Sequence, residues 1–155
     1  MDERLEQALL VLPERLGGHM LVSVAAILVG VLISIPAGIY ATRSPRMQAA
    51  LMTVASIIQT IPGLALLALM VPLLGMIGFW PAFIALALYS ILPTLRNTVT
   101  GIRQIDEELI EAARGVGMTE GQVLRMVELP LALPMIIAGI RTATVWVVGM
   151  ATLST

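Results

Sequence analysis

Residues 21–42 read LVSVAAILVGVLISIPAGIYAT and contain no charged side chain. A helix needs roughly 20 apolar residues to cross the hydrocarbon core of a bilayer, so this stretch predicts a first membrane-spanning helix. It ends at Arg43-Ser-Pro-Arg46, where charge and a proline return. Lipid, rather than water, is therefore expected to be the solvent in which this chain folds.

The composition of the whole chain supports that expectation. The 155 residues are 58% hydrophobic and 12% charged, whereas a soluble domain is about 45–50% apolar and about 25% charged. A water-facing fold of this size could not bury so much apolar surface. The absence of cysteine excludes disulfide frameworks, thiolate metal sites and cysteine nucleophiles.

The next uncharged block, residues 47–95, is long enough for two further spans. A turn is expected at residues 75–78, Gly-Met-Ile-Gly, because glycines favour turns and because Phe79 and Trp80 favour the headgroup level. The second span would then end near residue 74, and the third would run from about 81 to 95. Pro62 frees a backbone carbonyl that only protein or water can satisfy, which predicts a kink that faces other helices.

Residues 96–128 are rich in charge, and residues 129–155 are apolar again except for Arg141. The chain is therefore predicted to be an all-α, polytopic membrane bundle with about four spanning helices. The membrane domain would cover residues 21–155, with a water-facing loop at 96–128. Residues 1–20 are expected to form an interfacial segment, or else a frayed start without a role.

Arginine placement predicts the orientation. Six arginines lie in residues 43–46 and 96–128, which fall on the same side of the membrane, whereas the N-terminal segment holds two arginines and four acids. By the positive-inside rule both loops would be cytoplasmic and the N-terminus outside.

The polar loop predicts two short helices that meet at a glycine corner. Residues 106–114 carry acids in the first turn, where the helix dipole favours them, and Gly115 and Gly117 can end that helix. Thr119 and Gln122 have the spacing of a capping box. The second helix is expected to stop before Pro130.

Such a corner would make a rigid arm on which a partner could dock. Its small residues allow close approach, its charges lie at the edge, and Gly117 permits a backbone angle that other residues resist. The residues concerned are Glu111, Ala112, Ala113, Arg114 and Gly117. The alternative is a solvated loop that rests on the headgroups.

One spacing pattern in this region resembles the EAA signature of binding-protein-dependent ABC importer permeases. It reads Glu111-Ala112-Ala113, three residues, Gly117, nine residues, Val127, one residue, Leu129-Pro130. In that signature Ile is usual at the position of Val127. The resemblance implies that the segment is the coupling helix, which sits in a groove of a separate ATPase. The docking segment would comprise Glu111, Ala112, Ala113, Arg114, Gly117, Leu129 and Pro130.

Further motifs, at residues 59–62, 92–98, 110–115 and 128–142, are similar to those of osmoprotectant permeases. The resemblance implies a type I ABC importer permease fold of the methionine-importer kind, in a bacterial inner membrane. Family members continue for some tens of residues, so the chain is expected to lack a C-terminal part.

The implied function is that of a permease subunit that imports quaternary amines such as glycine betaine and is itself not an enzyme. The implied partners are an ABC ATPase, a second permease subunit and an extracytoplasmic binding protein, with no role for nucleic acid. ATP and Mg would be held by the ATPase, and no cofactor by this chain. The alternatives are a permease for another small solute, such as an amino acid, and a membrane scaffold without transport function.

Arg141 would lie only about 10 Å deep if the last span began near Pro134, so it could reach the surface or pair with Glu128. Otherwise Arg141 would be a gate or pathway residue. Pro62 is the other candidate for a gating or structural role. With six aromatic residues in the chain, no aromatic cage for a quaternary amine is expected.

Small residues recur at every fourth position of the first span and predict close helix packing, either within the subunit or between two subunits. They are Ala26, Gly30, Ser34 and Gly38. His19 has no neighbouring metal-ligand residues, so a metal site there is not expected.

Overall fold

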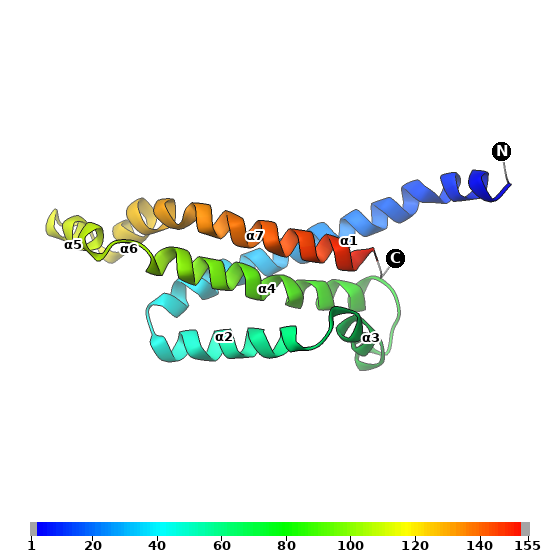
Figure 1. The fold of residues 1–155 in the computed structure, drawn as a ribbon, viewed down its shortest axis with the longest axis horizontal. Helices are drawn as coiled ribbons and strands as arrows, with labels where there is room; N and C mark the ends of the chain where they lie inside the picture. Colours follow the sequence, from blue (N-terminus) through cyan, green and yellow to red (C-terminus); the bar gives the residue numbers. More distant parts are fainter. Residues whose placement is uncertain (1–2, 153–155) are drawn as a thin grey trace.

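The computed structural model describes the backbone of residues 3–152 and the side chains of residues 10–152, and the regular structure in that range is entirely helical. The elements are α1 (Glu3–Thr42), α2 (Pro45–Thr60), α3 (Gly63–Leu74), α4 (Phe79–Arg103), α5 (Glu107–Gly115), α6 (Glu120–Val123), the π-helical turn η1 (Leu124–Glu128) and α7 (Leu129–Ala151). The helices α1, α4 and α7 pack together along the long axis, and α5 and α6 lie beyond one end of the bundle (Figure 1).

Three helical segments within the described residues are long and apolar enough to cross a membrane: Leu10–Thr42, Phe79–Arg103 and Glu120–Ala151. A fourth crossing would be made by α2 and α3 together, which are bent by 93° where they meet. The predicted bundle of about four spans is confirmed as three continuous helices and one broken pair.

The first helix starts earlier than expected. A span beginning at residue 21 was predicted, yet α1 is continuous from Glu3, so most of the predicted separate segment at 1–20 is the first part of that helix. This part extends past the ends of α4 and α7 (Figure 1). His19 joins α1 to α7, since its Nε2 donates to the Val148 carbonyl at 3.2 Å.

The predicted kink at Pro62 is confirmed as a full break. Ile61 is extended, with ψ 123°, and Pro62 precedes the first residue of α3. The Tyr89 hydroxyl donates to the Ile61 carbonyl at 2.6 Å, and Gln59 Nε2 donates to the Tyr89 carbonyl at 3.1 Å. The carbonyl freed at the break is thus satisfied by α4, as the absence of water in a bilayer requires.

The helix at the centre of the bundle is α4. Ser90, Thr94 and Thr98 are fully buried on it, and each hydroxyl donates to a carbonyl of its own preceding turn. Back-bonding of this kind lets hydroxyls lie between helices without an unpaired polar group. The polar loop was predicted to begin at residue 96, which is wrong, because α4 runs to Arg103 and buries Val99 and Ile102 against its neighbours.

The small residues of α1 are packed within this subunit. A Cβ atom placed on Gly30 would meet Ser90 Oγ at 1.6 Å, and one on Gly38 would meet Thr98 Cβ at 2.8 Å. Ala26 and Ser34 are fully buried. The four-residue repeat therefore brings α1 against α4, which confirms the intrasubunit interpretation of the pattern.

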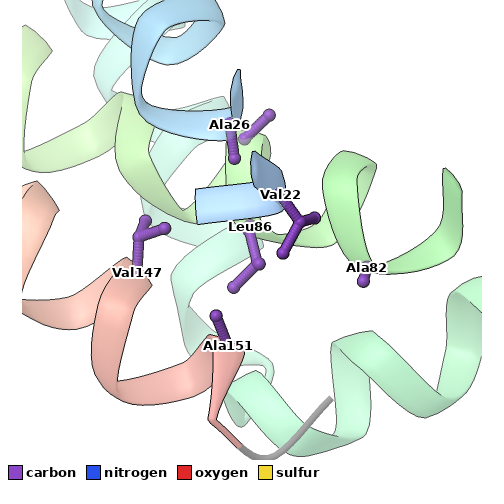
Figure 2. Packing of buried hydrophobic residues seen from close by; sticks show 7 residues of the cluster. Val22, Ala26, Ala82, Leu86, Val147 and Ala151 are labelled. Atoms are coloured by element: carbon purple, nitrogen blue, oxygen red, sulfur yellow. The ribbon is translucent and has the colours of Figure 1, made fainter. Parts of the chain in front are cut away.

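Near the other end of the bundle, α1, α4 and α7 share one apolar cluster. Figure 2 shows Val22 and Ala26 of α1, with Val147 and Ala151 of α7, gathered around Leu86 of α4. Leu86 is the large residue among mostly small ones, so it fills the space between the three backbones.

The second helix after the glycine corner does not stop before Pro130, so that prediction is wrong. From Glu120 to Ala151 the structure is a single helical segment, interrupted only by the π turn η1. In this turn the Leu129 amide bonds to Leu124 O, five residues back. A π turn holds one residue more than an α turn, which makes room where the Pro130 ring would otherwise meet the carbonyl before it.

Candidate functional site

The site expected from the sequence begins with α5, a nine-residue helix with both ends fixed. Asp106 caps it, because its Oδ1 accepts from the Glu108 amide at 3.1 Å. Glu107 and Glu108 stand in the first turn and Arg114 in the last, which matches the direction of the helix dipole.

A glycine corner follows α5. Gly117 has φ +88°, a backbone angle that side chains with a Cβ rarely adopt. The Gly117 amide donates to Arg114 O at 2.9 Å, and the Met118 amide donates to Ala113 O at 3.2 Å. These bonds satisfy carbonyls at the end of α5, as a left-handed cap does.

The predicted capping box at the start of α6 is confirmed. The Gln122 amide donates to Thr119 Oγ1 at 3.4 Å, and the Thr119 amide donates to Gln122 Oε1 at 2.8 Å. The cap of α5 and this box thus fix the N-terminal ends of the two helices that form the corner.

An ion pair closes the corner. Arg114 Nε donates to Glu120 Oε1 at 2.8 Å, and the terminal nitrogen Nη2 of Arg114 donates to Glu120 Oε2 at 3.1 Å. The hydrogen bond to Glu120, followed by the charge of that carboxylate, raises the pKa of Arg114 above its ordinary value. Arg114 therefore binds its own chain across the corner, rather than standing free at its edge.

The outer surface of the corner consists of Glu111, Ala112 and Gly117, all of which are exposed. Ala113 is buried, so only one of the two alanines expected to admit a partner is open to one. Two exposed apolar residues of this region were not among the predicted docking residues: Leu109 and Val116, the latter 77% exposed. Leu109, Ala112 and Val116 have the spacing of one helix face, a pattern that could have revealed them.

Leu129 and Pro130 do not belong to this surface. They open α7, on the far side of α6 and η1. Leu129 packs against the buried cluster of Ile102, Ala132 and Ile136, whereas Pro130 is exposed. The spacing motif thus divides into an exposed part on α5 and a part that anchors the start of α7.

Glu128, at the junction of η1 and α7, is only 4% exposed and pairs with Arg43. The terminal nitrogen Nη1 of Arg43 donates to Glu128 Oε1 at 3.1 Å, and Nη2 donates to Oε2. Arg141 was one expected partner of Glu128, and that expectation is wrong. Arg141 lies at the middle of α7, with an exposed side chain, because the helix begins well before Pro134.

The fold has solved counterparts. An inward-facing structure of the MetNI methionine ABC transporter superposes with a TM-score of 0.83 and 23% identity, over 99% of this chain and 76% of that one. An amino acid ABC transporter crystallised with histidines gives a TM-score of 0.75 and 22% identity over the same shares. At this identity the likeness establishes the type I ABC importer permease fold alone.

Closer relatives are found by sequence. The choline transport system permease protein OpuBB of Bacillus subtilis (strain 168) is 48% identical over 136 residues, 88% of this chain and 62% of that protein. The glycine betaine/carnitine/choline transport system permease protein OpuCB of the same strain is 45% identical over 138 residues, 89% and 63%. The osmoprotectant import permease protein OsmW of Salmonella typhimurium (strain LT2) is 40% identical over 136 residues, 85% and 63%.

The chain thus spans 62 to 63% of the length of these three relatives. The profile of a family described as "binding-protein-dependent transport system inner membrane component" matches residues 18–154, which include every helix from α2 to α7 and most of α1. This chain, a multi-pass membrane protein by its apolar helices, belongs to the family of binding-protein-dependent transport system inner membrane components.

Proposed function

We propose that this chain is the permease subunit, or the major part of one, of an ATP-driven importer for quaternary-amine osmoprotectants such as glycine betaine, carnitine and choline. The observation that carries the proposal is the identity of 40 to 48%, over 85 to 89% of the chain, to permeases named for these solutes.

The corner formed by α5 and α6 is the docking site for the ATPase. It lies beyond the end of the bundle and offers Glu111, Ala112 and Gly117 on an exposed surface. Leu109 and Val116 add apolar area, which an ATPase groove would bury. Arg114 keeps the corner rigid through Glu120, and Leu129 anchors the start of α7 beyond it. The ATPase holds ATP and Mg, and this chain contributes no catalytic residue.

The corner is cytoplasmic and the N-terminus is outside, by the arginine distribution. When two ATPase subunits close on nucleotide, α5 moves with them, and the ion pair of Arg43 with Glu128 passes the movement to the end of α1. A second permease subunit completes the passage, and an extracytoplasmic binding protein delivers the solute. The break at Pro62 lets α2 and α3 move separately.

Co-purification with the ATPase tests the docking site. The chain is co-expressed with its ATPase partner, and the pair is isolated in detergent. Gly117→Asp and Glu111→Lys are expected to lower ATPase recovery at least tenfold. Gly18→Asp is the control, because Gly18 is also exposed, has an ordinary backbone angle and lies in α1, outside the corner.

Uptake by proteoliposomes tests the transported solute. The complete importer, with its binding protein, is expected to accumulate radiolabelled glycine betaine only when ATP is enclosed. Retention of the ATPase by both docking variants would contradict the docking site. ATP-dependent uptake of an amino acid but of no quaternary amine would contradict the substrate class and leave the permease architecture in place.

A further inference from the structure

Arg141 lies deep in the last helix, although no other charged residue occurs between positions 129 and 155. It stands 13 residues beyond Glu128, which at 1.5 Å per residue is about 20 Å along the helix axis. The hydrocarbon core of a bilayer is about 30 Å thick, so Arg141 belongs near its middle. Charged residues at that depth face a water-filled passage or another protein surface, not lipid.

The packing of α7 fixes which way Arg141 faces. The helix buries one side against its neighbours through Ala132, Ile136, Gly139, Ala143 and Val147. Arg141 is exposed on a different side, and no ion pair is formed by it with the residues that the structure describes. That side of α7 is therefore not expected to face lipid.

An open cavity of about 400 Å³ lies along this side of α7. All of its lining residues belong to α7 itself: Ala138, Arg141, Thr142, Val145 and Trp146. At about 100° per residue, Arg141 and Trp146 are about 140° apart around the helix axis, and the three smaller residues lie between them. The cavity thus has a cation on one flank and an indole on the other.

Trp146 is held in place by an aromatic contact with α4. Its ring lies 6.4 Å from the ring of Tyr89, between centroids, and Tyr89 is itself fixed by its hydrogen bond to Ile61 O. Trp146 remains 45% exposed. Part of the indole is thus supported by α4, while the rest is open to the cavity.

We propose, on the basis of the proposed function, that this cavity is a substrate subsite for quaternary amines that carry a carboxylate. The Arg141 guanidinium binds the carboxylate through paired hydrogen bonds, the geometry to which its planar fork is suited. The Trp146 indole face receives the trimethylammonium group. One aromatic residue and one arginine suffice here because the ligand has two charged ends, whereas a cage of several aromatic residues would recognise only the amine.

The subsite separates solutes that share an ammonium group. Glycine betaine and carnitine present both charges, whereas choline has a hydroxyl and no carboxylate. Arg141 therefore contributes to binding of the first two and little to binding of choline, while Trp146 contributes to all three.

The test is equilibrium binding to the purified complex of permease and ATPase without the binding protein. Radiolabelled glycine betaine and choline are the probes. Arg141→Gln is expected to weaken glycine betaine at least tenfold and choline less than twofold. Trp146→Leu is expected to weaken both about equally, and Trp146→Phe to restore much of the loss. Arg103→Gln, an exposed arginine in the last turn of α4, is the control.

Gel filtration and the basal ATPase rate establish that each variant is assembled. Arg141→Lys keeps the positive charge while removing the planar guanidinium. The subsite is overturned if the wild-type complex binds neither probe, or if Arg141→Gln weakens choline as much as glycine betaine. Uptake by the wild-type importer is measured in parallel. If the wild-type importer takes up no quaternary amine, the proposed function is overturned. Normal uptake without binding would overturn the subsite alone.

Discussion

Arg43 and Glu128 are 85 positions apart in the sequence and meet in a two-point ion pair. Arg43 directly follows α1, and Glu128 is the last residue of the π turn. The exposed fraction of the two side chains differs widely, at 40% for Arg43 and 6% for Glu128. The carboxylate therefore depends on the guanidinium for most of its solvation.

Replacing Arg43 with Gln should destabilise the subunit by about 2 kcal/mol, because it leaves a nearly buried carboxylate without a cation. Thermal unfolding in detergent measures the change. Arg46→Gln, at an exposed arginine three residues on, is the control and should shift the midpoint little. The exchanged pair, Arg43→Glu with Glu128→Arg, should recover part of the loss. If the exchanged pair lost as much stability as Arg43→Glu and Glu128→Arg lose separately when added together, a direct interaction would be contradicted.

Gly30→Ala should destabilise the bundle by about 1–3 kcal/mol, since overpacking forces backbones apart. The added methyl would meet Ser90 Oγ, which lies 1.6 Å from the position of the new Cβ atom. Unfolding by denaturant in micelles is the measurement.

Gly149→Ala provides the matched comparison, because apart from the local backbone of α7 no atom lies within 4 Å of the position that its new Cβ atom would take. It should be neutral or slightly stabilising, as alanine favours helix more than glycine does. Equal effects at the two glycines would show that α1 and α4 are not in close contact there.

Tyr89→Phe should loosen the break between α2 and α3. The variant removes the hydroxyl that satisfies Ile61 O, and a buried carbonyl left unpaired costs about 1–3 kcal/mol. Because the chain has no cysteine, a single cysteine at position 61 can report the opening through its rate of thiol labelling. That rate should rise in the Tyr89→Phe background and stay unchanged with Tyr40→Phe, where the tyrosine is exposed.

Gly117→Ala should disturb the corner without unfolding the bundle. Alanine at φ +88° costs roughly 1–2 kcal/mol, and α5 contacts mainly α6 and η1. Hydrogen exchange should therefore quicken at the amides of 107–119 and remain unchanged in α4. Quicker exchange throughout the chain would contradict the independence of the corner.

Local patterns in the sequence predicted local structure well. The capping box of Thr119 and Gln122, the left-handed Gly117 and the break at Pro62 each depend on a few neighbouring residues, and all three are confirmed. The small-residue repeat of α1 predicted close packing for the same reason, because its period is that of the helix itself.

Features that depend on distant residues were not predicted. Pairing of Glu128 with Arg141 was one of the possibilities expected from the sequence, but the partner of Glu128 is Arg43, directly after α1. The burial of Ala113 follows from how the corner packs, which no pattern within α5 reveals. The helix continues through Pro130 by means of a π turn, and hydrogen bonds across five residues leave no signal in the hydrophobic period of the sequence.

That π turn also sets the rotational phase between the two ends of the same helical segment. One residue corresponds to about 100° of rotation in an α-helix. A deletion within Leu124–Glu128 that restored a regular helix would turn α7 by that angle relative to the corner of α5 and α6. Arg141 and Trp146 would then face a different neighbour while the corner kept its place. A relative with such a deletion would need changes elsewhere to restore the orientation of α7 relative to the corner. The length of Leu124–Glu128 should therefore vary less among relatives than the lengths of the turns around it.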